Sequence, residues 1–124
     1  MSYLTAQISA STSGDNTVIA APSTINPPTG GAGSSYTPSI IVHGYLIVAA
    51  GSVVARFYNG ASASTLPLTG PMSMITGTPI AFGDPSTLSG RSQPFAFKLS
   101  AGSALVLNLG AGVQVSGHII YSIL

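Results

Sequence analysis

The side chains that could carry acid–base or metal chemistry in this chain are few: Asp15, Asp84, His43 and His118. An acid–base catalyst needs a titratable group tuned by a pocket, and a metal site needs several converging ligands. Both aspartates lie in Gly-Asp turn sequences, where a short carboxylate caps its own backbone. The histidines have no third ligand beside them, so each is expected to be buried and hydrogen-bonded or to lie at an interface. The sequence therefore predicts no acid–base site and no metal site.

Nucleophile and phosphate-binding motifs are also missing from the sequence. Serine is abundant, but no Gly-x-Ser-x-Gly sequence occurs and no acidic residue stands near a histidine. The glycines of residues 30–33 are followed by neither a lysine nor a helix-forming segment, so they predict a flexible turn and not a phosphate loop. There is no cysteine, which removes disulfides and thiolate ligands. We expect a protein that is not an enzyme and binds no cofactor.

Charge is scarce in this chain of 124 residues. Charged residues make up 4% of it, against about 25% in an ordinary soluble domain. Only three residues are cationic and the net charge is +1, so nucleic-acid binding is not expected. A surface with so few charges protects a monomer poorly against self-association, which favours an oligomer or a subunit on a larger assembly. A neutral surface rich in Ser and Thr could also keep a monomer in solution.

The hydropathy profile predicts neither a membrane span nor a secretion signal. Mean hydropathy is +0.52. The longest apolar stretch, residues 40–55, is interrupted by His43, Gly44, Gly51 and Ser52 and is shorter than the ~20 residues of a spanning helix. The first five residues contain no basic segment and no apolar segment of a signal peptide. The chain is expected to be soluble, with no membrane partner.

Turn-forming residues recur at short intervals and separate runs of Val, Ile, Leu, Phe and Tyr, which is typical of an all-β sandwich or barrel. No window has a 3.6-residue apolar period, so no helix is expected. The chain predicts one antiparallel β-sandwich domain with strands near residues 6–10, 16–21, 39–50, 52–58, 65–68, 72–75, 79–82, 95–99, 105–109 and 113–123. Alternating polarity and short turns predict that the last three strands form a meander, and that 39–50 and 52–58 form a hairpin.

The segment from Ser39 to Ala50 is apolar on both faces. A strand covered on one face alternates in polarity, so this one should be covered on both. The second cover is another subunit, a folded-over arm or a loop of the same chain.

Two segments without an apolar period are candidates for contact with a partner. Residues 1–5 are expected to form an extended, flexible N-terminal arm, and residues 22–38 a long loop rich in Pro, Gly, Ser and Thr. A loop of that length is either functional or simply mobile. The predicted contact residues are Tyr3, Leu4, Ile25, Tyr36, Ile40 and Val42, with Tyr3 and Tyr36 as aromatic anchors.

Several segments together carry a resemblance to a known family: Thr12–Ala21 (TSGDNTVIAA), Ile41–Gly51 (IVHGYLIVAAG), Val53–Gly60 (VVARFYNG), Leu68–Met74 (LTGPMSM), Ala104–Leu109 (ALVLNL) and Val113–Tyr121 (VQVSGHIIY). With them the chain resembles the small β-sandwich proteins encoded beside capsid and tail genes in tailed phages, which include head decoration (cement) proteins. The similarity spans roughly residues 6–124 and consists of strand and turn patterns. It implies a jelly-roll-like sandwich, a homo-oligomer that is often a trimer, and binding to the lattice of the major capsid protein. The segment Pro22–Pro38 departs from the family, because a short turn is expected there.

The expected function is that of a virion structural protein. It would be made in the cytoplasm of the host bacterium and would stabilise the outer surface of a phage capsid. The alternative is a receptor- or glycan-binding head domain of a tail fibre, built on a similar sandwich. That function needs a rim of aromatic and polar side chains around a shallow pocket.

Overall fold

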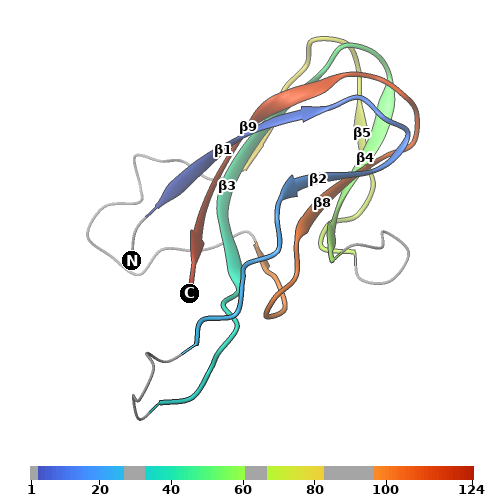
Figure 1. The fold of residues 1–124 in the computed structure, drawn as a ribbon. Coiled ribbons are helices and arrows are strands. Elements are labelled where there is room, and N and C mark those ends of the chain that lie inside the picture. The colour runs from blue at the N-terminus through green and yellow to red at the C-terminus, as the bar shows by residue number, and fades with distance from the viewer. Residues whose placement is uncertain (1–2, 27–32, 61–66, 83–96) are drawn as a thin grey trace.

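The structure, a computed structural model, describes residues 3–26, 33–60, 67–82 and 97–124. These residues form strands and no helix, in two antiparallel sheets, which confirms the predicted all-β sandwich (Figure 1). None of the described residues belongs to a helix able to cross a membrane.

The first sheet, sheet A, contains β1 (Leu4–Ala10), β9 (Val115–Ile123), β3 (Ile40–Ala49) and β6 (Ile80–Phe82) in that order, and β7 (Phe97–Lys98) also pairs with β3. The second sheet, sheet B, has the order β2 (Gly14–Ile19), β8 (Leu105–Leu109), β4 (Val53–Asn59) and β5 (Met72–Met74). The pairs are nested along the chain: β4 with β5 innermost, then β3 with β6 and β7, β2 with β8, and β1 with β9 outermost. Strands from the first half of the chain therefore pair antiparallel with strands from the second half, as the two arms of a long hairpin do.

The core lies between the sheets and is filled by alternate residues of each strand. Leu105, Leu107 and Leu109 of β8 are buried, as the alternation in the sequence predicts. On β9, Val115 and Ile119 are buried in the same way.

An aromatic cluster joins the two sheets within this core. The Tyr45 ring of β3 lies 5.0 Å from the Phe57 ring of β4, measured between centroids. Phe97 of β7 lies 5.6 Å from Phe57 and 6.2 Å from Tyr45. Such pairs stabilise a core beyond the area that they bury. Burial also raises the pKa of the Tyr45 phenol.

The predicted pairing of consecutive strands is wrong. β3 and β4 do not form a hairpin and β7, β8 and β9 do not form a meander, because each short turn carries the chain from one sheet to the other. The alternation of polarity determines which face of a strand is buried, but a corner between sheets has the same pattern as a hairpin. The strands predicted near 72–75 and 79–82 are present as β5 and β6. Of the predicted strand 65–68, Pro67 forms only a single bridge with Tyr58, and residues 65, 66, 95 and 96 lie outside the described residues.

The turn role predicted for Asp15 belongs to its neighbour. Asp15 lies in β2 opposite Asn108, whose side-chain amide donates a 2.8 Å hydrogen bond to the carboxylate. The Asn16 side chain instead caps the turn, donating to the carbonyl oxygens of Thr12 at 2.8 Å and Gly14 at 3.2 Å. An amide both donates and accepts, which a carboxylate cannot do. Asp84 lies outside the described residues.

The predicted N-terminal arm is shorter than residues 1–5. Strand β1 begins at Leu4, which pairs with Tyr121 of β9, and Thr5 pairs with Ile120. Residues 1 and 2 lie outside the described residues.

The predicted loop 22–38 contains a paired ribbon in its described part. Ile25 and Tyr36 exchange two backbone hydrogen bonds, of 2.8 and 3.0 Å. The hydroxyl groups of Thr24 and Thr37 lie 2.9 Å apart. Figure 1 shows both sides of this ribbon extending from the end of the sandwich that carries the two termini. The two sides of the ribbon are thus held to each other by a β-bridge.

Candidate functional site

Exposed apolar side chains gather at the end of the sandwich where the chain begins and ends. Six of the large hydrophobic residues there are at least 41% exposed, and we call them the terminal surface: Tyr3, Leu4, Ile25, Tyr36, Ile123 and Leu124. Tyr36 and Leu124 are each 54% exposed. Exposed apolar side chains gathered on one part of a domain are typical of a surface that contacts a partner.

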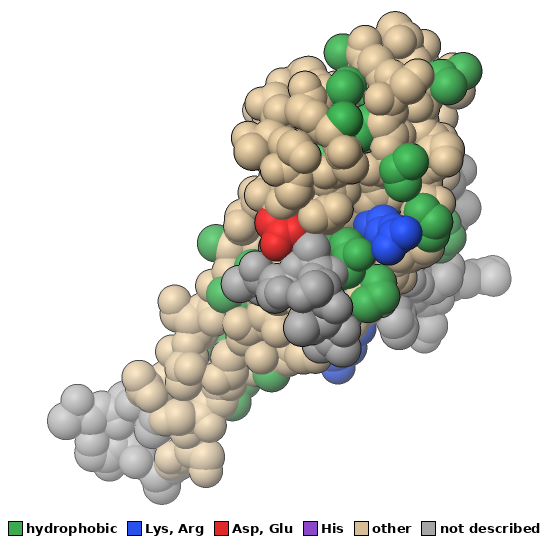
Figure 2. Space-filling view, turned by 90° about the vertical axis from the view of Figure 1, so that its right-hand side faces the viewer, with side chains coloured by type: hydrophobic (Ala, Val, Ile, Leu, Met, Phe, Trp, Pro, Cys, Tyr) green, Lys and Arg blue, Asp and Glu red, His purple; other side chains and the backbone are tan. Residues whose placement is uncertain are grey.

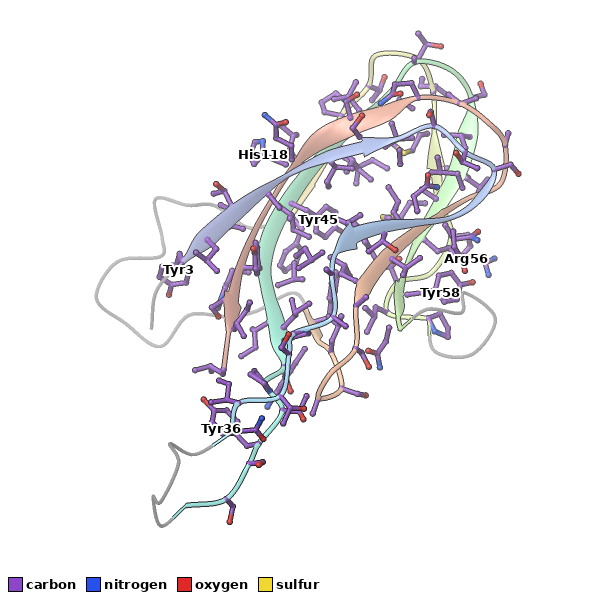
Figure 3. The ribbon with its side chains drawn as sticks, viewed as in Figure 1. Tyr3, Tyr36, Tyr45, Arg56, Tyr58 and His118 are labelled. Atoms are coloured by element: carbon purple, nitrogen blue, oxygen red, sulfur yellow. The ribbon has the colours of Figure 1, made fainter. Side chains whose placement is uncertain are left out.

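Strand pairing brings the members of the terminal surface together. Leu4 at the start of β1 pairs with Tyr121, close to the end of β9. Ser39 exchanges backbone hydrogen bonds of 2.8 and 3.0 Å with Leu124, and it directly precedes β3 at the base of the ribbon. Figure 3 shows Tyr3 and Tyr36 at this same end of the molecule. Residues from both ends of the chain and from the ribbon therefore lie at one end of the molecule.

Four of the predicted contact residues belong to this surface, and two do not. Tyr3, Leu4, Ile25 and Tyr36 are exposed, whereas Ile40 and Val42 are 0% exposed and lie in the core between the sheets. Their side chains already pack within the chain, so they are not available to a partner and the structure removes them from the candidate set.

Ile123 and Leu124 were missed by the sequence analysis. In the last strand the alternation of apolar and polar residues puts Ile123 in the row that should be buried, but Ile123 is 41% exposed although its partner Ile40 is buried. The alternation alone gives no sign of this exposure.

The outer face of β3 is covered within the single chain at its first half. Ile41 is 7% and His43 is 4% exposed, although both lie away from the core cluster. The Tyr3 ring meets the His43 ring edge-on at 4.8 Å between centroids. A second subunit is therefore not required to cover this end of β3.

His43 and Ser122 form a buried hydrogen-bonded pair that the sequence did not predict. The His43 Nε2 and Ser122 Oγ atoms lie 2.8 Å apart across β3 and β9, at a shift in the register of those strands. Nδ1 of the same ring is buried and has no hydrogen-bond partner among the described residues. Because burial removes the ring from water, the pKa of His43 is lowered from its ordinary value of 6.5.

A serine beside a histidine base is the first half of a nucleophilic site. Ser122, however, is 0% exposed, so its hydroxyl has no path to a substrate in this structure. The pair acts as a polar link between two strands, in agreement with the expectation of a buried, hydrogen-bonded histidine at position 43.

His118 lies on the same outer face of sheet A but is exposed, opposite Leu46 and Gln7. It lines a shallow groove of about 210 Å³ together with Gly44, Leu46, Phe82 and Ile120. Within the described ranges, no three His, Cys, Asp or Glu side chains converge closely enough to hold a metal ion.

A second groove lies at the far end of the sandwich, where β4 and β5 meet the turn after β8. It has a volume of about 450 Å³ and is lined mainly by Val53, Val54, Met74 and Ile75, of which Ile75 is 62% exposed.

Charge plays little part in any of these surfaces. Acidic and basic side chains are few on the face of the molecule drawn in Figure 2, which is mostly uncharged. The register of sheet B places Asp15, Asn108 and Arg56 in one row across its outer face. This row is the main polar feature of that sheet among the residues described, and it lies on strands that do not contribute to the terminal surface.

Comparison with known proteins finds no family whose model matches this chain, and no curated protein or solved structure that is detectably similar to it.

Proposed function

We propose that this chain is a virion structural protein that decorates and stabilises the outer surface of a phage capsid, binding the lattice of the major capsid protein as an oligomer. In this proposal the protein is made in the cytoplasm of the host bacterium and ends in the virion. The terminal surface is the part that contacts the capsid.

The concentration of exposed apolar side chains at the terminal surface is the observation that carries the proposal. Tyr3 and Tyr36 supply two aromatic rings at that end, and aromatic residues are enriched among the side chains that dominate binding energy. The ribbon around Ile25 and Tyr36 extends this surface beyond the sandwich (Figure 1). A projecting ribbon reaches into a neighbouring subunit more easily than a flat sheet does.

The order of the strands supports the jelly-roll architecture that the resemblance implies. The pairing is nested and distributes the strands as β1, β9, β3 and β6 in one sheet and β2, β8, β4 and β5 in the other. This distribution agrees with the one expected of an eight-stranded double Greek key. The short strand β7 is an addition beside β6 on β3. Jelly rolls are common in viral capsid and lectin domains, so the architecture agrees with the proposal without requiring it.

Stabilisation of the capsid would follow from mass action. A protein that binds the assembled lattice and not the free capsid subunits favours the assembled state by its binding free energy. An oligomer that contacts several subunits gains further affinity from effective concentration. No catalytic step is required, and scarce charge suits a surface that is largely covered after binding.

The test uses capsids that lack this protein. The purified chain is expected to co-sediment with such heads and to raise the temperature at which they rupture. Tyr36→Ala should weaken this binding by about tenfold or more, because a central aromatic contact is worth at least about 1.4 kcal/mol. Ile75→Ala is the matched control, since it removes an apolar side chain of similar exposure at the far end of the sandwich. The proposal fails if the chain neither co-sediments with the heads nor changes their rupture temperature.

A second candidate function is a receptor- or glycan-binding head domain of a tail fibre. The groove beside His118 favours it, because an exposed aromatic ring, Phe82, and an imidazole border a shallow hollow over Gly44. Aromatic faces and a few polar groups are the usual elements of a small-molecule site. Binding on a glycan array that is lost in Phe82→Ala, together with no affinity for capsids, would select this function over decoration.

A further inference from the structure

Three of the four edges of the two sheets carry features that discourage pairing with another chain. Strand β2 has a register shift between Thr17 and Ile19 and bears Asp15. Strand β5 is only three residues long. The opposite edge of sheet A consists of β6 and β7, of three and two residues, and β7 carries Lys98. Short strands, bulges and charges are the devices by which natural proteins protect sheet edges.

Strand β1 has none of these protections. It is seven residues long, Leu4–Ala10, and contains no charge and no proline. Its register with β9 runs without a shift from Leu4↔Tyr121 to Ala10↔Val115. In the part of the chain that is described, β1 pairs with β9 and with no other strand. The unpaired backbone groups along its outer edge are therefore a template for another strand.

We propose that β1 pairs antiparallel with β1 of a second copy of this chain, around a two-fold axis at Gln7. The two A sheets then form one continuous sheet. A two-fold contact of this kind is the commonest way in which soluble proteins form oligomers. It is a dimer contact, and differs from the trimer that the resemblance implies.

The side chains of β1 match their own copies in this register. Pairing around Gln7 sets Thr5 opposite Ser9 of the second copy and Ala6 opposite Ile8, so outward residues meet outward residues and inward residues meet inward ones. Gln7 meets Gln7, and no like charges face each other because the strand has none. The outward row Thr5, Gln7 and Ser9 is exposed in the single chain and so is available for the contact.

The pair has a consequence for the proposed function. Because the two copies of β1 run in opposite directions, the two terminal surfaces lie at opposite ends of the pair. One pair could then bridge two neighbouring capsid subunits, and two linked contacts hold more tightly than one. This bridging role rests on the proposed function, whereas the pairing of β1 does not.

Cysteine cross-linking tests the pairing and its register together, because the natural chain has no cysteine. Residues opposite each other in an antiparallel pair have Cα atoms about 4.5–5.5 Å apart, which is within disulfide range. Gln7→Cys is therefore expected to form a covalent dimer without reductant. Thr5→Cys is the matched control on the same exposed row: its two copies would be four residues, roughly 13 Å, apart and should not cross-link. A mixture of Thr5→Cys and Ser9→Cys should cross-link into a mixed dimer.

Light scattering gives the second readout. The natural chain should have twice its monomer mass of 12.3 kDa at micromolar concentration. Gln7→Lys, which sets two like charges against each other, should return the mass to that of the monomer. Thr17→Lys, a matched charge on the protected β2 edge, should leave the dimer intact, and thermal unfolding of both variants checks that they fold. A natural chain that is monomeric, or a Gln7→Lys variant that remains dimeric, overturns the inference.

Co-sedimentation of the same samples with capsids separates the two proposals. A monomer that binds capsids refutes the β1 pairing alone, and a dimer that does not bind them refutes the decoration function alone.

Discussion

Replacing Gly117 with alanine tests how closely β9 approaches β3. Gly117 lies in the middle of β9, between Ile8 of β1 and Ile47 of β3 in the register of sheet A. An added Cβ atom would collide with the Leu46 carbonyl oxygen and would lie 2.8 Å from the carbonyl carbon and 3.1 Å from the Ile47 Cα atom. These are backbone atoms of the central strand, so no side-chain rotation relieves the contact. The φ angle of Gly117, +156°, is also one that residues with a Cβ rarely adopt.

The expected loss of stability can be estimated from these two effects. Inserting atoms into a well-packed site costs about 1–3 kcal/mol, and an unfavourable φ costs about 1–2 kcal/mol more. Gly117→Ala should therefore lower the free energy of unfolding by roughly 2–5 kcal/mol, a large part of the 5–15 kcal/mol typical of a domain. For a chain of 124 residues, with an unfolding entropy of about 2.1 cal/mol/K per residue, a loss of about 4 kcal/mol lowers Tm by about 15 °C.

Urea unfolding followed by circular dichroism measures this loss. Gly70→Ala is the matched control, because no atom lies within 4 Å of the Cβ that it adds and its φ angle is not in the region that favours glycine. That variant should be unchanged or more stable by up to about 1 kcal/mol. If Gly117→Ala falls within about 0.5 kcal/mol of the control, the close approach of β9 and β3 is wrong and with it the register of sheet A.

Three further outcomes follow from the core, the buried histidine and the first turn. Phe57→Ala should lose about 3–5 kcal/mol of unfolding free energy in the same assay, because it opens the aromatic cluster; a loss below about 1 kcal/mol would contradict that cluster. The pKa of His43 is lower in the folded chain than in the unfolded chain, so as the pH falls the unfolded chain takes up this proton at a higher pH than the folded chain does. The contribution of His43 to the free energy of unfolding should therefore be fully present above pH 6.5 and should decrease as the pH drops below that value. Urea midpoints at neutral and acidic pH measure this, and His43→Gln should remove the part of the pH dependence that His43 causes. Asn16→Ala removes the two turn hydrogen bonds of 2.8 and 3.2 Å and should lower the free energy of unfolding by about 1–2 kcal/mol. Thr17→Ala is the control, because it shortens the next and more exposed side chain, and it should not cause this loss.

The candidate contact surface was accessible to sequence reasoning only in part. Tyr3 and Tyr36 were predicted as contact residues because aromatic residues stand out in segments without an apolar period, and both are exposed. Ile40 and Val42 were misassigned because a strand that is apolar on both faces gives no sign of which face meets the core. The structure decides this, since both side chains are buried between the sheets while Ile41 and His43 lie on the outer side.

The sequence by itself determined the all-β class and the buried face of the later strands. The alternation of Leu105, Leu107 and Leu109 with polar or smaller residues is a local property, because successive side chains of a strand point to opposite faces whatever their partner is. Short turns between apolar runs were equally visible. These features depend only on neighbours along the chain.

Only the tertiary structure decided which strands pair. The turn between β3 and β4 and the turn between β8 and β9 cross from one sheet to the other, and no local signal separates such a corner from a hairpin. The contact of His43 with Ser122 and the position of Leu124 beside Ser39 depend on this choice. Partners are selected by the packing of the whole core, since every strand must bury its apolar face at once, and that condition cannot be read from any one segment.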